Sequence, residues 1–220
     1  MTAASFTELA AVPEPPLDDL ALALAAEFRA VDRVAALAAL DALGRELAGT
    51  PGARQPDPAA QARACAELLG RRHGFAGDRE DYDHPDNSML DVVLERRRGL
   101  PILLSVLYIE VARRASIPLV GVGLPGHFVV AHRGAEPPLV LDPFEGGAAV
   151  AGEFPEPMLQ PWSTVQIVMR MLNNLVSAYG RRTDFDGALR AARMRVVLPA
   201  PEAERRIVQA ELRALQARLN

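Results

Sequence analysis

The sequence contains no lysine, so arginine supplies all 24 of its permanently cationic side chains. It contains a single cysteine, Cys65, which excludes an internal disulfide, and such sparse usage fits a reducing compartment. The 28 acidic residues outnumber the arginines and give a formal net charge of −4. Without a basic excess the chain lacks the electrostatic footprint of a nucleic-acid-binding protein, and we expect no nucleic-acid partner.

Long hydrophobic runs are also missing. The most apolar segment, "GLPILLSVLYIEVA" at residues 99–112, is shorter than the roughly 20 residues that cross a bilayer, and it contains Glu110. The first 20 residues lack the basic stretch and apolar core of a signal peptide. We therefore expect a soluble, cytoplasmic protein that makes no contact with membranes.

Motifs for metals and phosphates are absent from the sequence. No HxxxH or CxxC spacing occurs, and the acidic loop around His84, with Asp81, Asp83 and Asp86, lacks the spacing and the glycine of an EF-hand. The glycine-rich "GVGLPG" at residues 121–126 leads into a β-type run instead of a helix. We expect neither a metal nor a cofactor.

Half of the residues are hydrophobic, which is ample for a core in 220 residues. Alanine-rich and leucine-rich residues 17–47 predict one or two helices, begun by Asp18 and Asp19 and ended near Gly52. Further helices are predicted at 60–75, ended by Gly74, and at 90–98, ended by Gly99. Pro101 suits the first turn of the next helix, and its nearly uniform apolar character over residues 101–114 predicts burial.

β-type runs follow at residues 118–124, 127–132 and 138–142, separated by glycine and proline. A buried helix followed by antiparallel strands indicates an α+β fold. From Pro161 the pattern predicts helices again, with a spacing of Leu172, Leu175, Tyr179 and Ala188 that loosely matches a tetratricopeptide hairpin. The expected regions are helices and a linker at 1–60, a core at 61–160 and a helical tail at 161–220.

His127 and Asp142 stand out as a candidate catalytic pair. If the turn between their strands centres on residues 134–135, antiparallel positions sum to 269 and the two residues lie directly opposite each other. A carboxylate that orients an imidazole is half of a nucleophilic catalytic apparatus. A slip of one residue would place the side chains on opposite faces. The alternative is that His127 packs beside the glycine turn while Asp142 caps the "DPFEGG" loop.

The order of these motifs resembles a known family. The segments "GFAGDREDYDHPDNSMLDVVLERRRGLPILLSVLYIEVARR" and "GLPGHFVVAH…VLDPFEGG" are similar to the SirB-type transglutaminase-like proteins of bacteria. The likeness covers residues 65–150, and the tail resembles the tetratricopeptide-like end of that family. The resemblance implies an α+β, papain-like core in which a buried central helix packs on an antiparallel sheet, flanked by N-terminal helices and a C-terminal helical hairpin.

The resemblance also implies a missing nucleophile. In transglutaminases the nucleophilic cysteine opens the central helix, and here Pro101 occupies that position. Proline can neither attack a carbonyl nor donate an N–H. Ser105, one turn along the helix, is a weak substitute, because mid-helix serines usually bond back to the helix carbonyls. Cys65 lies outside the motif and is expected to be an inert core residue. Glu110 requires a partner if buried, for which we expect one of Arg96, Arg97 and Arg98.

Three functional hypotheses remain. The first is a non-catalytic regulatory module that binds a protein or peptide through His127, Asp142, Gly126 and Phe128, with Asn87 as a further binding residue. The second is a hydrolase or acyltransferase in which His127 and Asp142 activate water or Ser105. The third is a scaffold in which the pair only stabilises the hairpin. We favour the first, and no pattern in the sequence indicates an oligomeric state.

Overall fold

The computed structural model describes residues 4–152 and 154–217 and contains both helices and sheet, so the α+β prediction is confirmed at that level. Three helices open the chain: α1 (Phe6–Ala10), α2 (Leu17–Ala26) and α3 (Arg33–Ala48). The long Ala/Leu-rich stretch divides because Asp32 starts a new helix, its side chain accepting the backbone N–H of Ala35 at 3.0 Å. This helix ends before Gly49.

The next helix changes its winding part of the way along. α4 (Pro58–Cys65) is an α-helix capped by Asp57, and it continues as the π-helix η1 (Ala66–Arg72). At Gly70 the backbone of η1 approaches the loop that follows the sheet so closely that a Cβ atom would lie 1.8 Å from the carbonyl oxygen of Gly146. The close approach requires a glycine at this position.

Four short elements precede the central helix in the chain. The strands β1 (Ala76–Gly77) and β2 (Arg98–Gly99) pair in parallel, and the 3₁₀ turn η2 (Pro85–Ser88) precedes α5 (Leu90–Arg96). α5 ends because Arg97 adopts a left-handed conformation with φ of 58°. Gly99, expected to stop this helix, lies instead in β2.

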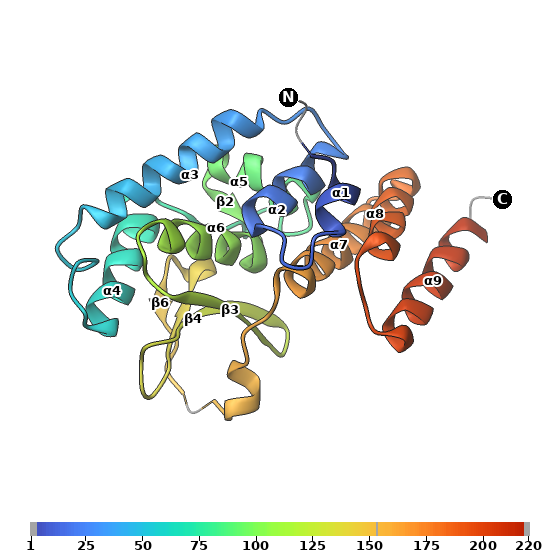
Figure 1. Cartoon of the computed structure of the whole chain (residues 1–220). Helices are drawn as coiled ribbons and strands as arrows, with labels where there is room; N and C mark the ends of the chain where they lie inside the picture. The colour runs from blue at the N-terminus through green and yellow to red at the C-terminus, as the bar shows by residue number, and fades with distance from the viewer. Residues whose placement is uncertain (1–3, 153, 218–220) are drawn as a thin grey trace.

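α6 (Pro101–Arg114) begins at the proline and ends with two arginines. All of its residues are buried except Ile109, Arg113 and Arg114. In Figure 1 it runs between α3 on one side and the sheet on the other. The uniformly apolar segment is therefore the helix around which the remaining elements pack.

The sheet is antiparallel with the order β3 (Leu119–Leu124), β4 (His127–His132), β5 (Leu139–Asp142) and β6 (Ala148–Ala149). Val130 pairs with Leu141, so cross-strand positions sum to 271, where 269 was predicted. The predicted register was wrong by two residues. A shift of two keeps each side chain on its face, whereas a shift of one would not.

The two faces of the sheet belong to different cores. Phe128, Val130 and Leu141 join the main core with α6. On the other face, Val122, Val129, Ala131 and Val140 form a smaller core. Phe154 and Leu159, from the segment around the 3₁₀ turn η4 (Glu156–Leu159), pack against this smaller core.

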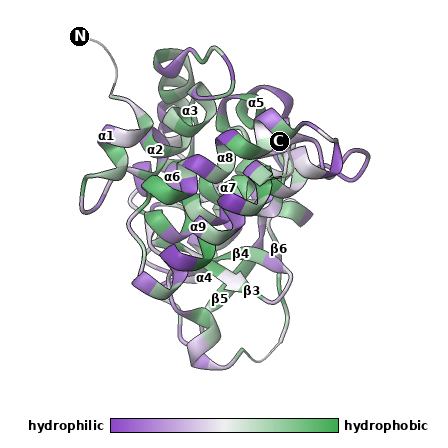
Figure 2. Cartoon of the chain, turned by 90° about the vertical axis from the view of Figure 1, so that its right-hand side faces the viewer, coloured by the Kyte–Doolittle hydropathy of each residue, from purple (hydrophilic) through white to green (hydrophobic). Residues whose placement is uncertain are grey.

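The tail consists of α7 (Thr164–Arg181), α8 (Phe185–Val197) and α9 (Glu202–Ala217). A capping box between Ser163 and Gln166 starts α7, and α7 and α8 pack as an antiparallel pair. In Figure 2 hydrophobic and hydrophilic positions alternate along these helices, as expected of amphipathic segments. The predicted helical tail extended to residue 220, and its last three residues lie outside the described part.

Candidate functional site

His127 and Asp142 are in hydrogen-bond contact. Nε2 of His127 lies 2.8 Å from Oδ2 of Asp142. The other carboxylate oxygen accepts the backbone N–H of Phe144 at 2.9 Å. The Asp142 side chain is 13% exposed and that of His127 is 32% exposed. Both carboxylate oxygens are therefore engaged, which holds the aspartate in one orientation toward the imidazole.

The ends of two strands bring this pair together. β4 starts at His127 directly after a tight turn, in which Gly126 has φ of +72°. β5 ends at Asp142, where Pro143 opens the 3₁₀ turn η3 (Pro143–Glu145). Continuing the register places Asp142 beside Val129 and thus diagonal to His127. A diagonal neighbour on the same face is within reach of a long side chain.

Phe144 forms a wall beside the histidine. Its ring meets the His127 imidazole edge-on, with centroids 6.3 Å apart, and Tyr82 packs against it at 5.9 Å. The guanidinium of Arg79 lies 5.4 Å from the centre of the ring, and the backbone of Gly77 touches it. Sequence reasoning missed Phe144, Tyr82 and Arg79. The one available signal was that Phe144 follows Asp142 by two residues.

Asn87 holds this wall to the central helix. Its Nδ2 donates to the carbonyl oxygens of Asp81 and Tyr82, at 2.8 and 3.4 Å. Its own carbonyl oxygen accepts the N–H of Leu100, the residue before Pro101, at 3.0 Å. Asn87 does not cap α5. It is only 1% exposed, as is Phe128, so neither side chain presents a surface to a partner.

The positions considered for a nucleophile hold either no nucleophilic group or a buried one. Pro101 occupies the first position of α6. Ser105 is fully buried, and its Oγ lies 3.5 Å from the carbonyl oxygen of Phe128 on the sheet, instead of bonding back along the helix as expected. Cys65 is also fully buried, and burial raises its pKa to about 12. Such a thiol is scarcely ionised near neutral pH.

Tyr108 is a buried polar residue that the sequence reasoning missed. It is fully buried, and its hydroxyl has no hydrogen-bond partner among the described residues. A Cβ atom at Gly147 would approach this hydroxyl to 2.9 Å, so the oxygen lies under the loop that follows Asp142. Burial raises the pKa of Tyr108, and the nearby Cys65 and Asp142 raise it further.

Glu110 is paired, but with different arginines from those expected. Arg113 and Arg114, from its own helix, each contact its Oε2 at 2.7 Å. The expected partners lie elsewhere: Arg96 pairs with Asp86, and Arg97 and Arg98 donate to backbone carbonyls. The expectation was wrong because the partners are one helical turn away in the C-terminal direction. A turn-based search would have found them.

Trp162 lies immediately before α7, at the point where the tail meets the sheet. Its backbone N–H donates to the carbonyl of Gly121 at 3.0 Å, and its ring packs edge-on against Phe128 with centroids 5.3 Å apart.

No three histidine, cysteine, aspartate or glutamate side chains gather as a metal site within residues 4–152 and 154–217. Over the same residues, no helix is both long enough and apolar enough to cross a membrane.

Comparisons with known proteins identify relatives of this chain. Residues 34–173 match the transglutaminase-like superfamily. A UPF0162 protein of Xylella fastidiosa is 39% identical over an alignment of 162 residues, and the match covers 64% of this chain and 58% of that protein. One from Pseudomonas aeruginosa is 39% identical over 137 residues, 60% of this chain and 48% of that protein. Human F-box only protein 21 is 43% identical over 56 residues, 26% of this chain and 9% of that protein.

The chain thus spans about half the length of the curated bacterial relatives it matches, 58% of one and 48% of another. No solved structure matches it. The superfamily match covers more than half of the chain and includes His127, Asp142 and the Pro101 position. On this evidence the chain belongs to the transglutaminase-like superfamily.

Proposed function

We propose that this chain is a non-catalytic, cytoplasmic regulatory module of the SirB type, and that it binds a protein partner. One observation carries the proposal. His127 and Asp142 are joined at 2.8 Å, yet Pro101 stands where the nucleophilic cysteine would open the helix. A base and its orienting carboxylate without a nucleophile cannot carry out acyl transfer through a covalent intermediate.

The burial of the alternatives supports this proposal. Ser105 and Cys65 are both fully buried, and Ser105 is oriented toward a backbone carbonyl of the sheet. Among the described residues, the only hydrogen bond of the His127 ring is the one that Asp142 accepts. The half-exposed imidazole, the Gly126 turn and the Phe144 wall then provide a polar and aromatic surface. The tetratricopeptide-like pair of α7 and α8 offers a second surface suited to a peptide.

The first experiment restores the missing group. The variant Pro101→Cys introduces a thiol, and the pH dependence of its alkylation by iodoacetamide reports its pKa, ordinarily about 8.5. If this position faces a retired catalytic pair, we expect the pKa to be at least about one unit lower, as for thiols beside histidine. Adding His127→Ala should return it toward the ordinary value. Native Cys65, with its pKa of about 12, should remain silent.

Thr164→Cys is the control for helix position, because Thr164 is also the first residue of a long helix but lies in α7. It reports the contribution of a helix N-terminus alone. If the thiols at 101 and 164 titrate alike, and His127→Ala changes neither, position 101 does not face the pair. The proposal of a retired catalytic site would then fail.

The second candidate function is a hydrolase that uses water directly. The oriented His127 favours it, because water attack needs a base but no side-chain nucleophile. Hydrolysis of p-nitrophenyl acetate distinguishes the candidates. A non-catalytic module should give the same rate for the wild type, His127→Ala and Asp142→Asn. A wild-type rate at least about tenfold above both variants would establish the hydrolase and overturn the non-catalytic proposal.

A further inference from the structure

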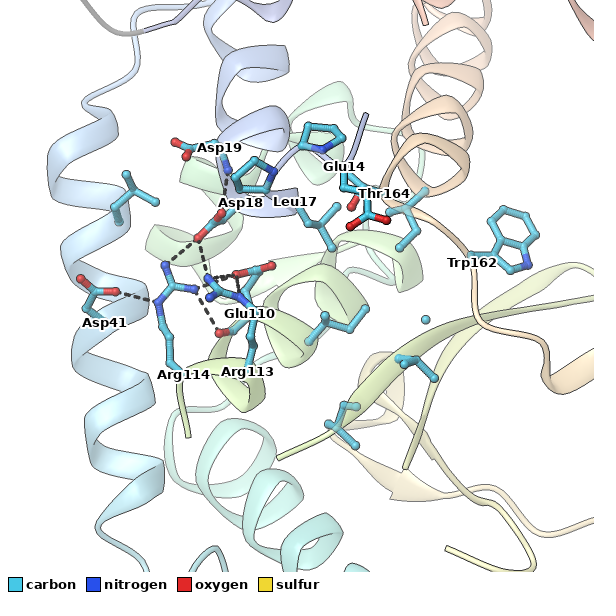
Figure 3. Close-up of a pocket in the computed structure, with 18 residues that line it drawn as sticks. Glu14, Leu17, Asp18, Asp19, Asp41, Glu110, Arg113, Arg114, Trp162 and Thr164 are labelled. Atoms are coloured by element: carbon cyan, nitrogen blue, oxygen red, sulfur yellow. Dashed lines mark hydrogen bonds and ion pairs between the residues drawn. The ribbon is translucent and has the colours of Figure 1, made fainter. Parts of the chain in front are cut away.

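A cavity of about 710 Å³ lies away from His127, between α2, α6, β3 and the start of α7. Its lining combines charged and apolar side chains, and Figure 3 shows the ionic cluster on one side and Trp162 on the other. Five of the lining residues are acidic and two are arginines. The acidic ones are Glu14, Asp18, Asp19, Asp41 and Glu110, and the arginines are Arg113 and Arg114.

The ionic side is built on two buried carboxylates. Asp18 and Glu110 are 3% and 2% exposed, although they come from different helices. Arg114 joins them, with contacts of 2.6 Å to Asp18 and 2.7 Å to Glu110, and its Nε reaches Asp41 on α3 at 2.7 Å. Every described ion pair of Glu110 ends on Oε2. This part of the lining is held rigidly by three helices.

The arginines do not neutralise the lining. Five carboxylates and two guanidinium groups leave a formal charge of −3. Arg33, which is not part of the lining, pairs with Asp19 at 2.9 Å and offsets one of these charges. Glu14 is exposed, and no ion pair is described for it within residues 4–152 and 154–217. Asp41 is half-exposed at 51%, so negative charge also reaches the rim of the cavity.

The opposite side of the cavity is apolar. Trp162 packs against the backbone of Gly123, where a Cβ atom would lie 2.2 Å from the indole ring. Leu17, Ile109 and Ile167 continue this wall from three helices. An occupant of the cavity therefore meets an apolar wall and an excess of negative charge within one volume. Aliphatic chains that end in a cation satisfy both.

We propose that this cavity binds a basic segment of the protein partner, in which an arginine or lysine alternates with aliphatic residues. The cationic end would pair with the rim carboxylates of Glu14 and Asp41, and an aliphatic side chain would lie against Trp162. Charge complementarity selects this occupant over an acidic one. The inference rests on the proposed function, because it specifies the chemistry of the partner which that function requires.

Trp162 is the only tryptophan in the chain, so its fluorescence reports on the cavity directly. The probe is the acetylated and amidated peptide LRLRL, titrated at about 20 mM and again at about 200 mM salt, since rim ion pairs are screened by salt. We expect a saturable change in emission that weakens at the higher salt. The double variant Glu14→Gln, Asp41→Asn should weaken binding about five- to tenfold, as expected for the loss of two exposed ion pairs.

Two comparisons give the measurement its specificity. Glu204→Gln removes an exposed carboxylate from α9, outside the cavity lining, and should bind the probe like the wild type. The peptide LELEL should not bind. Equal binding of LELEL, or an unchanged affinity in the double variant, would overturn the proposal. Equally tight binding of n-butylguanidine would also overturn it, in favour of a small cationic ligand.

Failure here is distinguishable from failure of the proposed function. If the probe does not bind while Pro101→Cys behaves as a retired nucleophile position, the module binds its partner through another surface. If the probe binds but the wild type hydrolyses esters through His127, the cavity is real and the non-catalytic function is wrong.

Discussion

Tyr108 carries a polar atom that the folded chain leaves without a described partner. Burying an unpaired hydroxyl costs about 1–3 kcal/mol. We therefore expect Tyr108→Phe to raise the free energy of unfolding by about 1 kcal/mol, because the ring is kept and only the oxygen is lost. Urea denaturation followed by circular dichroism measures this change. A loss of more than about 1 kcal/mol would mean that the hydroxyl stabilises the loop after Asp142.

Glu110 gives a pH dependence with a defined sign. Burial raises its pKa above the ordinary 4.5, against the opposing hydrogen bond from Arg113, and the charge of Asp18 raises it further. The folded state then binds the proton more tightly than the unfolded state. Its contribution to stability is complete below pH 4.5 and is lost as the pH rises through the folded pKa.

The variant Glu110→Gln cannot ionise and should escape this loss. We expect its free energy of unfolding, relative to the wild type, to increase steadily as the pH is raised from about 4 to 7. Urea denaturation of both proteins across that range provides the measurement. The opposite trend would show that Arg113 and Arg114 favour the ionised form. Burial raises the pKa of Asp18, but the hydrogen bond and charge of Arg114, together with hydrogen bonds from the Asp19 backbone and to Glu110, lower it overall.

Single residues differed in how well the sequence predicted them. The contact of His127 with Asp142 could be foreseen, because His127 begins one strand of a hairpin and Asp142 ends the other. The two-residue error in register left both side chains on the same face of the sheet. The surroundings of Glu110 could not, because Asp18 approaches it from a helix about 90 residues earlier, a distance no local spacing encodes. Asn87 acts through loop carbonyls, which carry no sequence signal.

Among the elements, η1 depends most on one residue. Gly70 packs so closely on the loop after β5 that Gly70→Ala forces a Cβ atom to within 1.8 Å of a backbone oxygen. We expect this substitution to lower the free energy of unfolding by about 3 kcal/mol, at the upper end of overpacking costs. Because the contact is between two backbones, no side chain can move to relieve it.

Gly180→Ala is the matched control for that experiment. Gly180 also lies within a helix, α7, but a Cβ atom there meets nothing within 4 Å. Its replacement should raise the free energy of unfolding by about 0.5–1 kcal/mol through helix propensity. Thermal and urea denaturation of the two variants should shift in opposite directions. Equal effects would show that the approach of Gly70 to Gly146 does not limit stability.

The boundaries of elements show where pattern reading stops. Pro101 and the paired arginines defined α6 because proline and dipole-matching cations have local causes. The end of α5 was missed because a left-handed Arg97, with φ of 58°, replaces the expected glycine. The π-helical winding of η1 was also unforeseeable, since it coincides with a contact to a loop more than 70 residues later.

At the scale of the whole molecule, one loop, residues 78–84, contacts both the tail and the aromatic ring beside His127. Arg181 and Arg182, at the end of α7, pair with Asp83 and Asp81 in this loop. We expect the double variant Arg181→Ala, Arg182→Ala to accelerate amide hydrogen exchange in residues 78–84 while α6 exchanges as before. Arg206→Ala, which removes an exposed ion pair within α9, should leave both unchanged. Unaltered exchange in the loop would show that these pairs do not restrain it.

Residues 81–83 of this loop contact two parts of the molecule. Asp81 and Asp83 hold the tail, whereas Tyr82 between them packs on Phe144, whose ring meets the edge of His127. A ligand that displaces the loop, whether it binds at the tail or beside His127, therefore alters the contacts at both places. Thermodynamic linkage makes this coupling reciprocal. If a ligand bound to the tail changes the affinity for a ligand at His127 by some factor, the ligand at His127 changes the affinity of the tail for its ligand by the same factor.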